Sequence, residues 1–252
     1  MRLAVLGLLA LLGDDAALQP QAQDWHRAVS ENLTTERVAG LLDLPEIVGG
    51  GCGPDQPGSI ALYAAASTAA APIGHIRLHV EDRQAGGVSC GAATVVVQRT
   101  AGGAEEQLPT EESGYEVAAA VVYERSGAWF RVALQRGSAW VNRDTPADFA
   151  SYPELLTERL AYLREGWDGR LWRAPGAAGP ARVPEGWAAR LGGVIPIDVL
   201  AVQRAGGTLW IRVRLQTETC GETIPKATPE TGWVPAYRSS GETSAWFHSR
   251  GC

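Results

Sequence analysis

The stretch ERSGAWFRVALQ (residues 124–135) has the alternation of a β-strand, with its tryptophan opposite the apolar face. Side chains along a strand point to alternate faces, so Phe130, Val132 and Leu134 share one side. Trp129 falls on the other side, together with arginine, alanine and glutamine. Because three apolar residues define the buried face, we expect Trp129 to lie on the outer face of a sheet.

A second stretch, TLWIRVRLQ (residues 208–216), repeats this arrangement. Its alternation predicts that Ile211, Val213 and Leu215 face inward, whereas Trp210 shares the outer side with two arginines and a glutamine. Two tryptophans placed alike in matching strings indicate a common reason for their position.

The two stretches belong to a degenerate internal repeat. LYAAA resembles LWRAP, VVYERSGAWFRVALQ resembles VLAVQRAGGTLWIRVRLQ, and GSAWV resembles TGWV, in the same order along the chain. The insertions between these strings differ in length. Repeated order predicts that one small β unit was duplicated, so that the chain carries two related modules.

Composition is that of an ordinary globular protein. The chain has 252 residues, of which 45% are hydrophobic and 20% charged, enough for one large or two small domains. The net charge is −6, and no cluster of lysine or arginine stands out. This balance disfavours binding to nucleic acid or to an anionic bilayer.

The N-terminus resembles an export signal. Met1 and Arg2 precede the apolar run LAVLGLLALLG (residues 3–13), which is too short for a permanent membrane anchor. We expect a signal peptide over residues 1–22, with cleavage after Gly13 or within residues 16–23. The alternative is a buried N-terminal strand or helix. With a signal, the protein would be periplasmic or secreted, and no later segment is long enough to span a membrane.

Export predicts disulfide bonds for the four cysteines, Cys52, Cys90, Cys220 and Cys252. Three pairings are possible, and the two β regions favour Cys52–Cys90 and Cys220–Cys252. Each bond would close a loop of roughly 30 to 40 residues, worth about 4 kcal/mol in the chain-entropy model. Peptide mapping of the non-reduced protein distinguishes the three pairings.

Secondary-structure signals in the remainder of the chain predict a mainly β protein. Leu33, Val38, Leu41 and Leu42 predict one short helix ended by Pro45. The string YPELLTERLAYLREG (residues 152–166) predicts a longer helix. The expected segments are an N-terminal helix and lead-in (23–58), a first β module (59–148), a connecting helix (149–168) and a second β module (169–252).

The first module resembles the bacterial SH3-like (SH3b) family of exported proteins. The resemblance lies in ALYAAASTAAAPIGHI followed by VVYERSGAWFRVALQRGSAWV, and LWRAPG, LWIRVRL and TGWV match more loosely in the second copy. It covers about a third of the residues, and the segment of residues 79–107 has no counterpart in the family pattern. It implies two small SH3-like β-barrel modules, joined here by the predicted helix, which bind peptide or cell-wall ligands and are often attached to an enzyme. It does not imply catalysis.

The same resemblance implies a ligand-binding surface made of aromatic side chains on one outer face. The implied set is Tyr63, Trp129 and Trp140 in the first module, and Trp172, Trp210 and Trp233 in the second. Exposed aromatics that stack on a sugar ring or a proline-rich peptide are a recurrent recognition mode. The alternative is that these tryptophans are covered by the helix, a loop or the other module.

The sequence offers no catalytic constellation and no cofactor site. His75 and His79 alternate with apolar residues on a predicted strand, where four residues span about 13 Å, too far for one metal ion. Neither Cys52 nor Cys90 opens a helix, as the nucleophile of a cell-wall peptidase would. We therefore expect a non-catalytic cell-envelope module that binds peptidoglycan or a peptide. A structural or interaction scaffold is the alternative, and a peptidase is the weaker one.

Overall fold

The structure is a computed structural model, and it describes part of the chain. The described residues are 37–48, 58–80, 93–115, 117–144, 148–157, 159–176, 184, 187, 193–219, 222–223 and 229–250. The predicted signal peptide (1–22), Leu33 of the predicted first helix and all four cysteines lie outside them.

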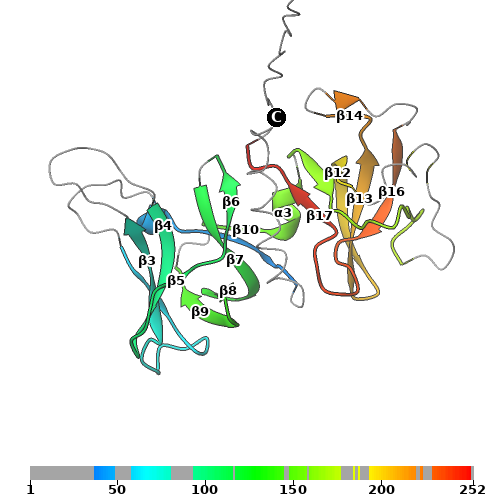
Figure 1. The fold of residues 1–252 in the computed structure, drawn as a ribbon. Helices are drawn as coiled ribbons and strands as arrows, with labels where there is room; N and C mark the ends of the chain where they lie inside the picture. Colours follow the sequence, from blue (N-terminus) through cyan, green and yellow to red (C-terminus); the bar gives the residue numbers. More distant parts are fainter. Residues whose placement is uncertain are drawn as a thin grey trace, which may run out of the picture.

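The fold is mainly β, as predicted, and consists of antiparallel sheets (Figure 1). A six-stranded sheet contains β10 (Phe149–Ser151), β1 (Gly40–Asp43), β7 (Val117–Ser126), β8 (Trp129–Ala133) and β9 (Ser138–Asn142) in this order, and β6 (Thr110–Gly114) pairs with β7. A four-stranded sheet has the order β2 (Ile60–Leu62), β3 (Gly74–Val80), β4 (Ala93–Arg99) and β5 (Glu106–Gln107). A five-stranded sheet has the order β16 (Glu230–Pro235), β13 (Thr208–Leu215), β12 (Ile195–Ala205), β11 (Ala161–Leu163) and β17 (Ala245–Phe247). A small hairpin joins β14 (Glu218–Thr219) to β15 (Glu222–Thr223), and the described helices are α2 (Pro45–Val48) and α3 (Tyr152–Leu156).

The predicted closure of the strands into barrels is wrong for the part of the chain that is described. Each sheet there is open and ends in edge strands. The six-stranded and four-stranded sheets instead face each other across a shared apolar core, which includes Phe130, Val132, Ile76 and Val97.

The predicted connecting helix over residues 149–168 is much shorter than expected. Of the described residues in this range, only Tyr152–Leu156 is helical, and the helix begins where the Ser151 N–H donates to the Glu154 carboxylate at 2.8 Å. The chain then becomes extended and forms β11, which pairs with β12 on one side and β17 on the other. Two-sided strand pairing and full burial of Ala161 and Leu163 override the helical spacing of the leucines.

The predicted first helix is also wrong over its described part. Gly40–Asp43 is strand β1, and Pro45 begins α2 instead of ending a helix. In a strand, the neighbouring side chains of Leu41 and Leu42 point to opposite faces, so both are buried, each in a different apolar cluster.

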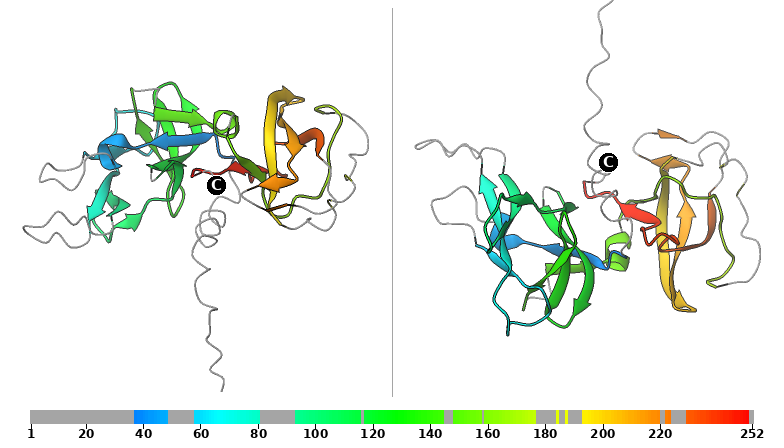
Figure 2. Two further views of the ribbon diagram at one scale, coloured as in Figure 1. Left: turned by 90° about the horizontal axis from the view of Figure 1, so that it is seen from above. Right: turned by 60° about the horizontal axis from the view of Figure 1, so that its bottom comes forward.

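The six-stranded sheet is apolar on both faces. On β7, Ala120 and Val122 pack into the core shared with the four-stranded sheet. Ala119 and Val121 point the other way, into a cluster that contains the core of the five-stranded sheet. The first half of the chain (residues 37–151) and the second half (159–250) therefore share one apolar core, with α3 lying between them (Figure 2).

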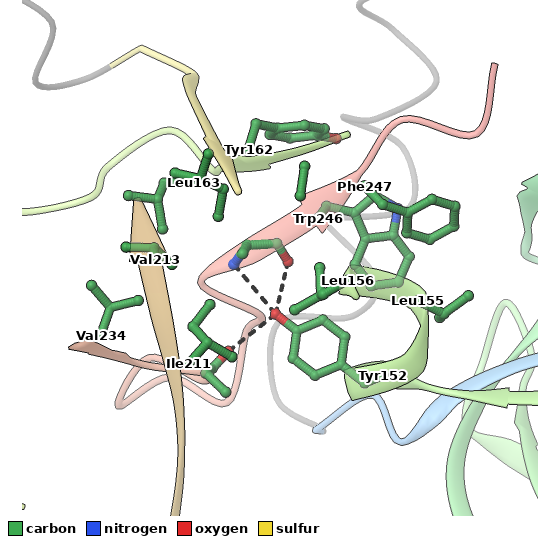
Figure 3. Packing of buried hydrophobic residues seen from close by; sticks show 14 of the residues in the cluster. Tyr152, Leu155, Leu156, Tyr162, Leu163, Ile211, Val213, Val234, Trp246 and Phe247 are labelled. Atoms are coloured by element: carbon green, nitrogen blue, oxygen red, sulfur yellow. Dashed lines mark hydrogen bonds between the residues drawn. The ribbon is translucent and has the colours of Figure 1, made fainter. Parts of the chain in front are cut away.

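Tyr152 lies at the centre of this junction (Figure 3). It is fully buried, its hydroxyl lies 2.8 Å from the carbonyl of Ala245, and it accepts the Ala245 N–H at 3.3 Å. Its ring stacks on Trp246 and packs beside Tyr237. Burial raises the pKa of Tyr152 far above its ordinary value, so the hydroxyl stays protonated and available as a donor.

Polar contacts from the middle of β6 reach the second half of the chain. The Glu112 carboxylate accepts hydrogen bonds from Ser249 at 2.9 Å and from Arg250 at 2.7 Å, which lower its pKa. The neighbouring Glu111 behaves oppositely. Burial raises its pKa to about 7, Arg164 opposes the increase, and the charge of Glu112 adds to it. One carboxylate is thus stabilised as an anion and the other as a neutral acid.

These opposite shifts predict opposite pH dependences for two neighbouring variants. The pKa of Glu111 is raised from 4.5 to about 7, so its contribution to stability is present at low pH and is lost as pH rises through 7. Glu111→Gln should raise the melting temperature at pH 8 and leave it nearly unchanged at pH 5. Glu112→Gln should lower it at pH 8, because the favourable charged hydrogen bonds are removed. Calorimetry at both pH values checks this, and a stabilising effect of both variants at pH 8 would contradict it.

Candidate ligand-binding surface

The internal repeat of the sequence has a counterpart in the strand order of two sheets. The orders β10-β1-β7-β8-β9 and β17-β11-β12-β13-β16 agree, both in the sequence of pairing and in the succession of strands along the chain. The four-stranded sheet and β6 are inserted in the first half before β7.

The registers agree as well. Val122 opposes Val132 in the first half, and Val199 opposes Val213 in the second. After each pair the register shifts by a bulge, and the next opposed pairs are Glu124↔Arg131 and Ala201↔Arg212. Trp129 and Trp210 therefore occupy equivalent places in the two sheets.

The six predicted site residues form two equivalent groups. Tyr63 bridges Trp140 with two backbone hydrogen bonds of 2.8 Å, and Trp172 bridges Trp233 with bonds of 2.9 and 2.8 Å. The rings of Tyr63 and Trp129 meet edge to face at 5.3 Å, and those of Trp172 and Trp210 at 5.5 Å. We call the two groups the first triad (Tyr63, Trp129, Trp140) and the second triad (Trp172, Trp210, Trp233).

The predicted inner faces agree with the structure. The inward residues Phe130, Val132, Leu134, Ile211, Val213 and Leu215 are all buried. Trp129 lies on the opposite face and is half-buried. The register inferred from the two tryptophan strings is therefore right.

Trp210 differs from its counterpart, because it is only 8% exposed. The edge-to-face contact with Trp172 accounts for part of this cover, and the indole Nε1 of Trp210 is buried without a hydrogen-bond partner. The alternative that a tryptophan is covered thus holds for Trp210. In the second triad the partly exposed rings are those of Trp172 and Trp233, and Trp210 supports the first of them.

An arginine stands beside each triad at the equivalent position. Arg131 donates to the Glu124 carboxylate at 3.2 Å and to the Ser138 hydroxyl at 3.1 Å. Its guanidinium also lies 5.4 Å from the centre of the Tyr123 ring. The charge beside the first triad is therefore compensated locally.

Arg212 stands beside the second triad without such partners. Its side chain is exposed, and it makes no hydrogen bond, ion pair or ring contact with any residue of the described ranges. The next residue on the same face, Arg214, donates to Asp198 at 2.9 Å. The sequence contained a signal for the different pairing of the two arginines, because the first repeat has Glu124 where the second has Ala201.

The histidines that suggested a metal site lie on one strand. His75 and His79 both belong to β3, and the Nδ1 atom of His79 lies 2.8 Å from the Glu105 carboxylate. Among the described residues, no group of three or more histidine, cysteine, aspartate or glutamate side chains could hold a metal ion. None of the helices found there is long and apolar enough to cross a membrane.

Comparison of the chain with protein-family models, curated proteins and solved structures found no match.

Proposed function

We propose that the protein is a non-catalytic binding module of the exported cell envelope, and that its two aromatic triads bind a peptide or cell-wall ligand. The observation that carries the proposal is the repetition of the triad. Three aromatic residues from three separate segments lie at equivalent register positions in both sheets, joined by one ring contact and one backbone bridge in each triad.

The proposal includes two SH3-like modules that arose by duplication, with α3 at their junction. Equal strand order, equal register and a bulge at the same place support it. Export through the N-terminal signal and the pairings Cys52–Cys90 and Cys220–Cys252 belong to the same proposal. They are supported by the sequence alone.

The chemistry of the triads favours stacking. An indole or phenol ring that is partly exposed offers a flat apolar face, and its rigid support lowers the entropy lost when a ligand is bound. Trp172 and Trp233 are fixed to each other by two backbone hydrogen bonds, and Trp172 also rests on the buried Trp210. The two backbones are therefore fixed, and the Trp172 ring is supported by Trp210, before any ligand is bound.

Co-sedimentation with purified peptidoglycan tests the function. We expect Trp233→Ala and Trp140→Ala each to weaken binding up to about tenfold, since one aromatic contact contributes about 0.5–1.5 kcal/mol beyond its buried area. The matched control is Tyr115→Ala, which removes a 68% exposed aromatic ring outside both triads and should leave binding unchanged.

Mass analysis of the soluble fraction separates the alternatives. Released muropeptides or free peptides would identify a peptidase and contradict the proposal. A structural or interaction scaffold would show neither cleavage nor co-sedimentation. Equal binding by the wild type, both tryptophan variants and the control would show that the triads are not the binding surface.

A further inference from the structure

The second triad presents a positive charge, that of Arg212, which no side chain of the described ranges pairs with. Arg212 lies directly opposite Trp233 on β16 and two residues from Trp210 on β13, so its side chain leaves the sheet on the face of the triad. On its other side it opposes Ala201, which has no polar group. On the same face, the Asp198 carboxylate is already bonded to Arg214 and Gln216.

The first triad has an arginine at the equivalent position, Arg131, but this arginine is paired with a carboxylate. Arg131 opposes Trp140 on one side and Glu124 on the other, and it is paired with the Glu124 carboxylate. An arginine already paired in this way gains little from a second anion. A free guanidinium, in contrast, forms strong charge-assisted and bidentate hydrogen bonds with a carboxylate.

We propose that the second triad, with Arg212, binds a sugar ring that carries a carboxylate, whereas the first triad binds a neutral ring. This inference rests on the proposed function of the triads and specifies their ligands. The partly exposed rings of Trp172 and Trp233 stack on the sugar, and Arg212 donates to its carboxylate. The two triads thus recognise different groups despite their common architecture.

The backbone at the second triad favours a sugar over an extended peptide. A peptide that adds to a sheet edge needs free backbone donors and acceptors along that edge. At the centre of the triad, the N–H and the carbonyl of Trp233 are both bonded to Trp172. Recognition there must use side chains, which is how a ring that stacks and carries one charged group is bound.

N-acetylmuramic acid and its methyl ester are suitable probes, because they share one ring and differ in a single negative charge. We expect the full-length protein at pH 7 and low salt to bind the acid about tenfold more tightly than the ester, which corresponds to one charge-assisted hydrogen bond. Titration followed by the indole N–H resonances of the protein measures both affinities. Added salt should reduce the preference, because the guanidinium is exposed.

Three variants test the role of the charge pattern. Arg212→Gln should abolish the preference for the acid, and Arg212→Lys should retain part of it. Ala201→Glu should also abolish the preference by placing a carboxylate beside Arg212, as Glu124 stands beside Arg131, while binding of the ester stays unchanged. Glu124→Gln should remove the carboxylate that neutralises Arg131, and should give the first triad a new preference for the acid. Unchanged melting temperatures verify that each variant is folded.

The outcomes separate this inference from the proposed function. Equal affinity for acid and ester in the wild type, or a preference that survives Arg212→Gln, overturns the inference, while retained co-sedimentation with peptidoglycan leaves the proposed function intact. A proline-rich peptide with a free C-terminal carboxylate and the same peptide with a C-terminal amide form a second pair of probes. If the protein prefers the free carboxylate in the peptide pair but shows no preference in the sugar pair, the inference is also overturned. If the wild type binds neither peptidoglycan nor the sugar probes, both the inference and the proposed function are overturned.

Discussion

Gly40→Ala should destabilise the protein by about 3 kcal/mol or more, at the upper end of what overpacking costs. Gly40 lies in the buried strand β1, between β7 and β10. A Cβ atom at this position would lie 2.2 Å from the backbone oxygen of Ala150 and 2.7 Å from the Phe149 ring. Backbone cannot move aside as a flexible side chain can, so the pairing of β1 with β10 must yield. Chemical denaturation measures the loss.

Gly114→Ala is the matched control. Gly114 also lies in a strand, and the nearest atom to a Cβ placed there is a methyl carbon of Val117 at 4.0 Å. No positive φ favours glycine at either position. The control should therefore change stability by less than about 0.5 kcal/mol. A similar loss in both variants would show that the close approach of β10 is not what makes Gly40 necessary.

Tyr152→Phe should cost about 1–3 kcal/mol, and Tyr152→Ala about 3–5 kcal/mol. The first variant removes only the hydroxyl, and it leaves the Ala245 N–H and carbonyl without their buried partner. The second variant also removes a ring that packs against Trp246 and Tyr237 at the junction of the two halves. Urea denaturation followed by tryptophan fluorescence measures both.

The matched control for this series is Tyr115→Phe, which removes a hydroxyl from a ring that is 68% exposed. It should change stability by less than about 0.5 kcal/mol. If Tyr152→Phe also left the stability unchanged, the hydrogen bonds of Tyr152 would contribute nothing measurable. The ring, which phenylalanine retains, would then account alone for the packing of the junction.

Local alternation was enough to predict the faces of β8 and β13. Their inward residues differ sharply in polarity from their outward residues, and a strand has only two faces, so the pattern leaves one register. The same reasoning failed over residues 149–168. Leu155, Leu156, Leu160 and Leu163 satisfy a helical stripe, but the burial that decides between helix and strand comes from β12 and β17, which lie far away in the sequence.

Several features of the candidate site required the tertiary structure. The string of Trp210 matches that of Trp129, yet Trp210 is 8% exposed beside the Trp172 ring, whereas Trp129 is half-buried beside the Tyr63 ring. The residue that the neighbouring strand places opposite also differs. Arg131 opposes Glu124 and pairs with it, whereas Arg212 opposes Ala201 and has no side-chain partner among the described residues.

By itself, the sequence determined the β class, the inner faces of two strands and the order of the repeat, because these follow from contacts between near neighbours and from binary patterning. The tertiary structure decided the open sheets, the short α3, the shared core around Tyr152 and the different charge beside each triad. These depend on which distant segments meet, and the free energy of such contacts is set by long-range packing and not by local propensity.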